Sequence, residues 1–261
     1  MKSYDPASPL ISLHIPKTGG SSLVRALERW FPAGRLIKHY RGKSGGLPVR
    51  HTLQGPVCVH GHFNAARGFG VAQYYPQVDQ FMTFLREPFD RFQSLWFFLN
   101  RMKREGRPVE ALDGDPDFQT FLHLRAAEQM QNRNSYSFVW QFPDVANHTD
   151  IGDLMDRRFV FVGIMERYRE SLDALAAVLG KPKAPAVHFN KTKRADNACE
   201  AWRPFYEKHF AAEFEIYEAA LARNADLIQR YQSQRPASIG EERSSVKVFS
   251  LARRWLGLRG D

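Results

Sequence analysis

Short apolar runs alternate with longer segments of helical periodicity along most of this chain. Apolar runs of strand length begin near residues 10, 57, 81 and 159. Elsewhere apolar residues recur at three- and four-residue spacing, which is typical of helices that bury one face. This alternation indicates an α/β fold with a central, mainly parallel sheet flanked by helices. The predicted helices span residues 20–31, 88–104, 117–132, 166–180, 200–211 and 213–232.

The first apolar run leads into a loop that carries a lysine and two adjacent glycines. Residues 14–22 read His-Ile-Pro-Lys-Thr-Gly-Gly-Ser-Ser, and the proline ends the strand. Gly19 and Gly20 allow the backbone to turn and to approach a ligand closely. The N–H groups at the helix start, the helix dipole and Lys17 together favour phosphate or a similar oxyanion. The helix cap is expected from one of the serines that follow, Ser21 or Ser22.

This loop differs from the phosphate-binding loop of ATPases and GTPases. That motif, G-x-x-x-x-G-K-[ST], has its lysine after the second glycine, whereas Lys17 precedes Gly19 and no glycine lies upstream of it. The loop instead resembles the 5′-phosphosulfate-binding loop of sulfotransferases. It most resembles the carbohydrate group that includes the heparan and chondroitin uronyl 2-O-sulfotransferases and their bacterial relatives.

The resemblance implies a P-loop-like sulfotransferase fold, with 3′-phosphoadenosine 5′-phosphosulfate as the sulfuryl donor. It also implies that the amides of residues 18–22 hold the 5′-phosphosulfate. Lys17 is then expected to neutralise charge on the bridging oxygen as the donor breaks. The hydroxyl groups expected to contact the same phosphosulfate are those of Thr18, Ser21 and Ser22.

A second motif follows the apolar run of residues 81–85. Residues 86–94 read Arg-Glu-Pro-Phe-Asp-Arg-Phe-Gln-Ser, and Pro88 suits the first position of a helix. An arginine fork and a hydroxyl suit a phosphate dianion, because arginine supplies paired charge-assisted donors. The pattern R-x-P-x-x-R-x-x-S resembles the 3′-phosphate-binding element of the same family. The resemblance implies that Arg86 and Ser94 hold the donor's 3′-phosphate.

Two histidines follow the apolar run near residue 57, where residues 56–63 read Pro-Val-Cys-Val-His-Gly-His-Phe. Open α/β sheets bind ligands at the carboxyl ends of their strands, and a histidine there can take a proton from a hydroxyl. The segment resembles the His-Gly-His or Gly-His-Phe element of the carbohydrate sulfotransferases, in which one histidine is the catalytic base. We favour His62 as that base, and we expect His60 to orient the sugar or to be structural. No metal is expected, since two histidines at i and i+2 rarely complete a coordination shell.

Other charged residues of these motifs have structural alternatives. Arg91 fits the second pattern, and its alternative is a helix-surface salt bridge with Glu87 or Asp90. The later pattern V-G-x-x-E-R-x-x-E-S resembles a strand and helix of the family, in which Glu166 and Arg167 are expected to form a structural pair.

A basic segment at residues 188–194 resembles the family's late loop, which closes over the donor. A solvated basic loop is the alternative interpretation of this segment. The cations expected to contact the donor there are Lys191, Lys193 and Arg194.

Composition and charge narrow the picture further. The 261 residues suit one sulfotransferase domain over residues 1–232, followed by a linker and a basic amphipathic tail over 233–261. The net charge of +9 suits an anionic donor and acceptor, and no nucleic-acid-binding motif accompanies it. We therefore expect no nucleic-acid partner. Two cysteines argue against a disulfide framework, and Cys58 is expected in the core.

The ends of the chain suggest where the protein acts. The N-terminus has no charged-then-apolar signal region, and no apolar run reaches membrane-spanning length, which predicts a cytoplasmic enzyme. Residues 246–258 have amphipathic spacing and an excess of basic residues, which suits peripheral contact with a membrane and equally suits packing against protein. Docking on the core or on another subunit is the alternative. The residues near the apolar face are Phe249, Ala252, Trp255 and Leu256.

The sequence thus predicts an enzyme that moves a sulfuryl group from the nucleotide donor to a hydroxyl of a carbohydrate or glycoconjugate. An atypical P-loop kinase is an alternative, for which Glu87 is the candidate magnesium carboxylate near these motifs. A non-catalytic protein that binds an anionic glycan on the same fold is another.

Overall fold

The protein is built on one five-stranded sheet. The computed structural model describes residues 1–42, 45–143, 150–185 and 197–233. All the strands of the sheet are parallel, in the order β2-β3-β1-β4-β5. This arrangement confirms the predicted α/β fold class. The strands are β1 (Leu10–Leu13), β2 (Leu36–His39), β3 (Cys58–Gly61), β4 (Phe81–Leu85) and β5 (Phe159–Ile164).

Four strands lie where the apolar runs predicted them, and β2 was missed. Strand β2 reads Leu-Ile-Lys-His and lies at the edge of the sheet, where only His39 is fully buried. An edge strand needs no continuous apolar run, because one side of it faces solvent. β1 is buried at every position, which confirms that its two faces are covered.

The helices largely follow the predicted periodicity. The third helix begins and ends at the predicted residues, because a proline starts it and charged residues end it. The helix predicted over 200–211 is divided into a 3-10 turn at Asn197–Trp202 and α7. The short α2 and α5 were not predicted. The α-helices are α1 (Gly20–Trp30), α2 (Val71–Tyr74), α3 (Pro88–Arg104), α4 (Phe118–Met130), α5 (Ile151–Arg158), α6 (Tyr168–Val178), α7 (Arg203–His209) and α8 (Ala211–Ser233).

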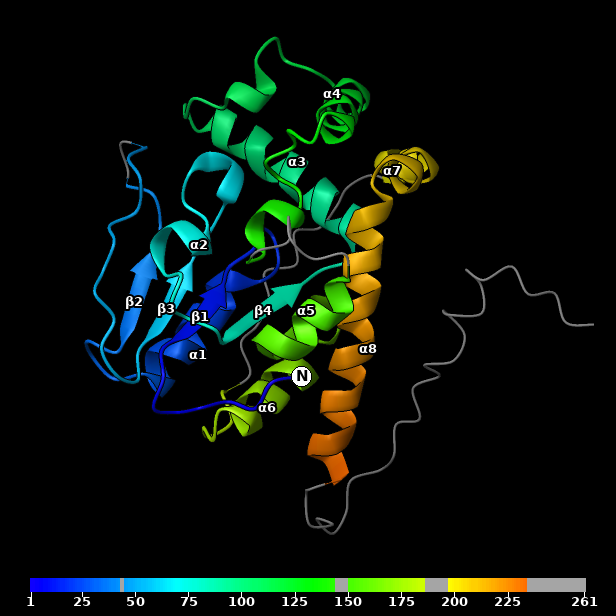
Figure 1. The fold of residues 1–261 in the computed structure, drawn as a ribbon. Coiled ribbons are helices and arrows are strands. Elements are labelled where there is room, and N and C mark those ends of the chain that lie inside the picture. The colour runs from blue at the N-terminus through cyan, green and yellow to red at the C-terminus, as the bar shows by residue number, and fades with distance from the viewer. Residues whose placement is uncertain (43–44, 144–149, 186–196, 234–261) are drawn as a thin grey trace, which may run out of the picture.

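Helices cover both faces of the sheet (Figure 1). Helices α1 and α6 pack on the face that carries Leu10 and Met82. Helices α2 and α5 pack on the opposite face, which carries Ile11 and Phe81. Helix α8 runs beside β5 and contributes residues to both apolar clusters. Burial of these faces is the main force that holds the layers together.

A third apolar cluster lies beyond the carboxyl ends of the strands. Helices α3, α4 and α7 meet there, away from the two layers that cover the sheet (Figure 1). Aromatic rings dominate the contact, and Phe92 lies within 5.0 Å of the Tyr206 ring centroid and 5.3 Å of that of Phe121. The cluster fixes the start of α3 against the end of the sheet, so it positions the second motif.

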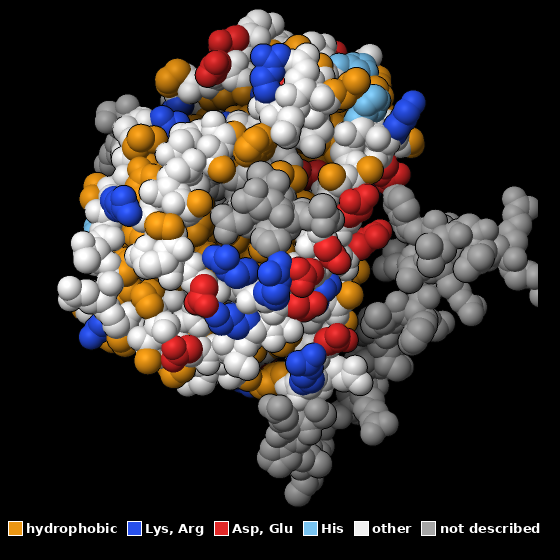
Figure 2. Space-filling view, in the orientation of Figure 1, with side chains coloured by type: hydrophobic (Ala, Val, Ile, Leu, Met, Phe, Trp, Pro, Cys, Tyr) orange, Lys and Arg blue, Asp and Glu red, His pale blue; other side chains and the backbone are white. Residues whose placement is uncertain are grey.

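The surface of the described part mixes charges of both signs. Over α5 and the neighbouring part of α8, basic and acidic side chains lie side by side (Figure 2). Arg223 pairs with Asp156 at 2.6 Å, and Arg157 pairs with Asp153 at 2.6 Å. The positive net charge is therefore partly balanced on this face. Within the described residues, no helix combines the length and the apolar character needed to cross a membrane.

Candidate active site

The loop between β1 and α1 has an unusual backbone. Lys17 has φ of +72° and Gly19 has φ of +85°, so two residues of the loop take the left-handed conformation. For lysine this conformation is uncommon, and such residues concentrate at functional sites. Gly19 is the N-cap of α1 and no side chain caps the helix, so the expected serine cap is wrong. Ser21 and Ser22 lie inside the first turn, and the first N–H groups of the helix remain without a side-chain cap.

Both glycines of the loop are required by close packing. A Cβ atom on Gly19 would lie 2.5 Å from Sδ of Met165, and one on Gly20 would lie 1.9 Å from Nε2 of His14. Real Cβ contacts are never so short, so a side chain at either position would displace its neighbour. The glycines therefore bring the helix start against His14 and the end of β5.

The hydroxyl groups of the loop differ in their surroundings. Thr18 is buried, and its hydroxyl donates a hydrogen bond to the carbonyl of Ile15 at 2.8 Å. Its proton is thus donated within the loop, where the bond stabilises the turn, and its predicted contact with the phosphosulfate stays a prediction. Ser21 is exposed and Ser22 is half-buried. Their predicted contact with the phosphosulfate stays a prediction, as do the contacts of the loop amides.

Lys17 lies in a group of cations on the side of α3. Its Nζ is 4.4 Å from the centre of the Phe98 ring, and the guanidinium of Arg101 is 5.5 Å from the same ring. Burial lowers the pKa of Lys17, and the nearby charges of Arg101 and Arg86 lower it further. A cluster of three cations that raises the local positive potential suits a polyanionic ligand.

Sequence reasoning found Lys17 and Arg86 but missed Arg101. Residues 94, 98 and 101 follow the spacing i, i+4 and i+7, which places Ser94, Phe98 and Arg101 on one face of α3. That spacing was available in the sequence. The phosphate-binding pattern, however, ends at Ser94 and does not include Arg101.

Arg86 lies at the junction of β4 and α3, as the second motif predicted. Its side chain is 22% exposed, and its Nη2 is 3.5 Å from Oδ2 of Asp90. A guanidinium has five N–H donors, so this ion pair leaves N–H groups for a further anion. Ser94 is half-buried on α3. Their contact with a 3′-phosphate stays a prediction.

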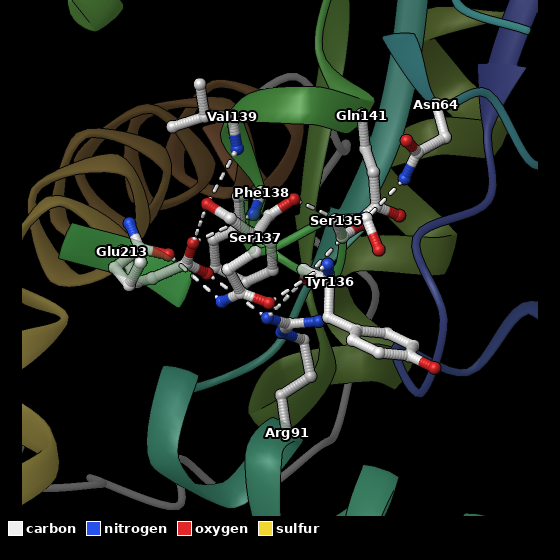
Figure 3. Close-up of polar contacts among 11 residues, drawn as sticks. Asn64, Arg91, Ser135, Tyr136, Ser137, Phe138, Val139, Gln141 and Glu213 are labelled. Atoms are coloured by element: carbon white, nitrogen blue, oxygen red, sulfur yellow. Dashed lines mark hydrogen bonds and ion pairs between the residues drawn. The ribbon is translucent and has the colours of Figure 1, made fainter. Parts of the chain in front are cut away.

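Arg91 has a structural role inside the protein. Its Nη2 is 3.2 Å from Oε2 of Glu213, and it donates a hydrogen bond to the carbonyl of Tyr136 at 3.1 Å. Figure 3 shows Arg91 and Glu213 directed towards each other beside the segment that contains Tyr136. The side chain of Arg91 is 4% exposed, so the alternative of a helix-surface salt bridge with Glu87 or Asp90 is wrong.

His60 lies within the sheet rather than in a cleft. The residue is fully buried in β3, and its Nδ1 is 2.9 Å from the Ser12 hydroxyl. Burial lowers the pKa of His60 from 6.5 to about 3. A neutral histidine with no access to solvent cannot exchange a proton with a substrate, so its surroundings are those of a structural residue.

His62 lies just beyond the end of β3 and is half-buried. Its Nδ1 is 2.6 Å from the backbone carbonyl of His14. A carbonyl can only accept, so Nδ1 carries the proton and Nε2 keeps its lone pair. Burial lowers the pKa of His62, partly offset by this hydrogen bond, so the ring is neutral near pH 7. The arrangement leaves a free base at the end of the sheet.

The acidic residues near these motifs are occupied by structural contacts. Glu87 caps α3 by accepting from the N–H of Asp90 at 2.6 Å, and it also pairs with Arg203 at 2.8 Å. Burial raises the pKa of Glu87. Its oxygens are thus engaged, which disfavours it as a magnesium ligand. In the described part of the chain, no group of three or more His, Cys, Asp and Glu side chains could hold a metal ion.

Glu166 and Arg167 were expected to form a pair, but each contacts other residues instead. Glu166 accepts hydrogen bonds from the N–H of Glu87 at 3.1 Å and the Tyr217 hydroxyl at 3.0 Å. Arg167 pairs with Glu170 at 2.9 Å. Each therefore has a structural partner of its own. Cys58 is buried in β3, which confirms its predicted place in the core.

Two predicted features lie outside the described residues. They are the basic segment with Lys191, Lys193 and Arg194, and the C-terminal tail from residue 234. The proposed donor contacts of the first and the membrane contact of the second stay predictions, as does the cytoplasmic location.

Comparison with known proteins gives the class of this protein. A model of the sulfotransferase family matches residues 3–213. The chain belongs to the sulfotransferase family. Membership confirms the predicted class of enzyme, a sulfotransferase that uses 3′-phosphoadenosine 5′-phosphosulfate as its donor.

Among solved structures, the chain is similar to mouse sulfotransferase SULT7A1 complexed with PAP. The two are 13% identical in sequence, the match covers 89% of this chain and 90% of that chain, and the TM-score is 0.49. No curated protein matches this chain.

Proposed function

We propose that this sulfotransferase transfers the sulfuryl group to a hydroxyl of a carbohydrate or glycoconjugate, with His62 as the general base. The observation that carries the assignment of the base is the hydrogen bond from His62 Nδ1 to the His14 carbonyl, at 2.6 Å. It leaves Nε2 unprotonated and free to accept the proton of an acceptor hydroxyl. The carbohydrate acceptor is supported by the resemblance of the His-Gly-His segment to that of the carbohydrate sulfotransferases.

The arrangement of strand ends supports a single site that contains both the base and the cation. Strands β1 and β3 are neighbours, and Leu13 pairs with Gly61 at their carboxyl ends. The loop with Lys17 follows β1, and His62 follows β3. The base and the cation therefore come from adjacent strand ends, where open α/β sheets bind their ligands.

In the proposed reaction, an acceptor hydroxyl oxygen attacks the sulfur of the donor. The bond between sulfur and the bridging phosphate oxygen breaks, and the proton of the hydroxyl moves to Nε2 of His62. Lys17 stabilises the negative charge that develops on the leaving phosphate oxygen. The left-handed backbone at Lys17 and its contact with Phe98 hold the ammonium group before the donor arrives. Catalysis of this kind depends on positioning and electrostatic stabilisation.

The protonation of His62 suits this role. A base must be neutral to accept a proton, and the burial that lowers the pKa of His62 keeps it neutral at pH 7. His60 also stays neutral, but it is fully buried and its Nδ1 is bonded to Ser12. We therefore assign proton transfer to His62 and a structural role to His60.

The alternatives receive less support. A kinase would need a free magnesium carboxylate, and Glu87 instead caps α3 and pairs with Arg203. A non-catalytic glycan-binding protein needs no base, whereas the fixed tautomer of His62 leaves its Nε2 able to accept a proton.

The test is transfer of labelled sulfate from the donor to a panel of glycans, glycolipids and small hydroxyl compounds. With the best acceptor, His62→Ala should lower kcat by about 10²–10⁴-fold, the usual span for general acid–base catalysis. Binding of 3′-phosphoadenosine 5′-phosphate should change little. His123→Ala, on α4, is the matched control and should retain kcat.

Two results would contradict the proposal. Near-wild-type kcat in a folded His62→Ala variant would remove the base, and a larger loss in His60→Gln would transfer the role to His60. Transfer to small phenols or amines with no transfer to any sugar would remove the carbohydrate acceptor but leave the base assignment standing.

A further inference from the structure

Four aromatic rings from three strand ends are packed together beside the base. His14 follows β1, Tyr40 follows β2, and His60 and His62 belong to the end of β3. The His14 ring stacks on His62 with centroids 4.5 Å apart and on His60 with centroids 5.3 Å apart. Tyr40 presents its ring edge-on to His62 at 4.9 Å. The base is thus enclosed by His14 and Tyr40, neither of which the catalytic scheme uses.

Hydrogen bonds fix the orientation of this cluster. The Tyr40 hydroxyl is 2.9 Å from Nδ1 of His14. The backbone carbonyl of the same histidine accepts the hydrogen bond from His62. Burial raises the pKa of Tyr40 and lowers that of His14, so both side chains are neutral near pH 7. Two neutral groups joined in this way hold one geometry without the cost of a buried charge.

His14 also touches the donor loop. Its Nε2 lies so close to Gly20 that a Cβ there would be 1.9 Å away. Gly20 is the first residue of α1, where the phosphosulfate is expected to bind. The single residue His14 therefore contacts the donor loop with its ring and the base with its carbonyl. Rotation of its ring would disturb the packing against Gly20 and the stacking on His62, whereas the carbonyl that His62 contacts belongs to the backbone.

We propose that Tyr40 and His14 act together as positioning residues: the Tyr40 hydroxyl fixes the His14 ring, and that ring fixes the angle of the His62 ring stacked on it. The inference rests on the proposed role of His62 as the base. A catalytic histidine needs a third group that orients it, because the wrong tautomer or ring angle prevents proton transfer. Here the Tyr40 hydroxyl fixes the His14 ring, which stacks on His62, and the backbone carbonyl of His14 fixes the His62 tautomer.

The test compares two tyrosine-to-phenylalanine variants in the full chain. Tyr40→Phe removes the hydroxyl that bonds His14 and keeps the ring. Tyr74→Phe is the matched control, because its hydroxyl also makes one hydrogen bond, to the carbonyl of Pro48 at 2.9 Å, and its ring lies edge-on to His39. Tyr40→Phe should lower kcat by about 3- to 10-fold, as one lost hydrogen bond predicts. Tyr74→Phe should leave kcat unchanged.

Two further readouts separate positioning from general damage. Affinity for 3′-phosphoadenosine 5′-phosphate should stay within about two-fold in both variants, because neither hydroxyl belongs to the donor loop. Nitrogen-15 NMR of labelled histidine should show one tautomer for His62 in the wild type and in Tyr74→Phe. The spectrum of Tyr40→Phe should keep this tautomer for His62, because the His14 carbonyl is unchanged, and should show a mixture of tautomers for His14, whose Nδ1 has lost its partner.

A double-variant cycle tests whether the two residues act as one unit. Tyr40→Phe combined with His14→Phe should lose no more kcat than His14→Phe alone, since the second change removes a bond already broken. Additive losses of kcat in the double variant would show that Tyr40 and His14 do not act as one unit. Wild-type kcat in Tyr40→Phe would overturn the inference. Equal losses of kcat in Tyr40→Phe and Tyr74→Phe would overturn it as well. If His14→Phe fails to fold, the tyrosine variants decide alone. An inactive His62→Ala beside an unaffected Tyr40→Phe would reject this inference and keep the proposed base.

Discussion

Arg91 and Glu213 form an ion pair in the interior, 122 residues apart in sequence and 3.2 Å apart in space. The two side chains are 4% and 1% exposed. Glu213 also accepts hydrogen bonds from the Ser137 hydroxyl and from the N–H of Phe138 (Figure 3). The pair thus joins α3, which carries half of the expected donor site, to the start of α8.

Loss of this carboxylate should destabilise the protein strongly. Glu213→Ala leaves Arg91 buried without its partner, which costs about 3–5 kcal/mol of the free energy of unfolding. Glu105→Ala is the control, because Glu105 directly follows α3 and its ion pair with Arg101 is exposed (48% and 61%), so it should contribute about 0–1 kcal/mol. Urea denaturation of both variants measures the difference. Similar losses in the two would contradict a special role for the buried pair.

Arg86 should distinguish nucleotides by their 3′-phosphate. Arg86→Ala removes a charge-assisted contact and should weaken binding of 3′-phosphoadenosine 5′-phosphate by about 1.5–3 kcal/mol. Binding of the analogue without the 3′-phosphate should change far less. Calorimetry with both nucleotides measures this, and Arg104→Ala, an exposed cation at the far end of α3, is the control. Equal losses for the two nucleotides would place Arg86 outside the 3′-phosphate site.

Lys17 should act more on the rate than on binding. Lys17→Ala removes the cation expected to stabilise the leaving phosphate oxygen. The value of kcat should therefore fall by about 10²–10³-fold, which is the usual effect of losing one preorganised donor to an oxygen that becomes negatively charged. Lys38→Ala is the control, because Lys38 pairs with Glu28 and is 55% exposed. Rapid-quench measurement of one turnover reports the chemical step. A loss confined to donor affinity would make Lys17 a binding residue.

Buried histidines should make the fold sensitive to acid. Burial lowers the pKa of His39 from 6.5 to about 4 and that of His60 from 6.5 to about 3. Between these values and 6.5 the unfolded chain binds more protons than the folded one, so protons favour unfolding. Above pH 6.5 these two histidines should not make the free energy of unfolding depend on pH. Below pH 6.5 the free energy of unfolding should fall as the pH drops towards 4.

A variant at His39 isolates that contribution. Its ring nitrogens have no hydrogen-bond partner among the described residues, and the ring stacks on Phe63 at 4.4 Å. His39→Phe should therefore fold normally at pH 7.5 and lose less stability than the wild type between pH 6.5 and 4. Denaturation curves at several pH values give the comparison. Parallel profiles of the free energy of unfolding against pH for the two proteins would show that His39 does not cause the loss of stability in acid.

Local pattern in the sequence was sufficient for the layers of the fold and for the two donor motifs. Buried strands read as continuous apolar runs, and Pro88 with its apolar periodicity defined the whole of α3. Lys17 and Arg86 were found because a loop at a strand end has a short, local signature. Edge strand β2 was missed because its Leu-Ile-Lys-His sequence contains neither a continuous apolar run nor a local motif.

The tertiary structure decided which charged and titratable groups are free and which are buried in pairs. His60 and His62 are two residues apart, yet one lies inside the sheet and the other at its end, so burial separates their roles. Arg91 matched a phosphate-binding pattern, but its charge is neutralised by Glu213, a partner no local pattern names. The tautomer of His62 likewise depends on the carbonyl of His14, 48 residues away. Burial and long-range pairing are properties of the folded chain, because they arise from residues that only folding brings together.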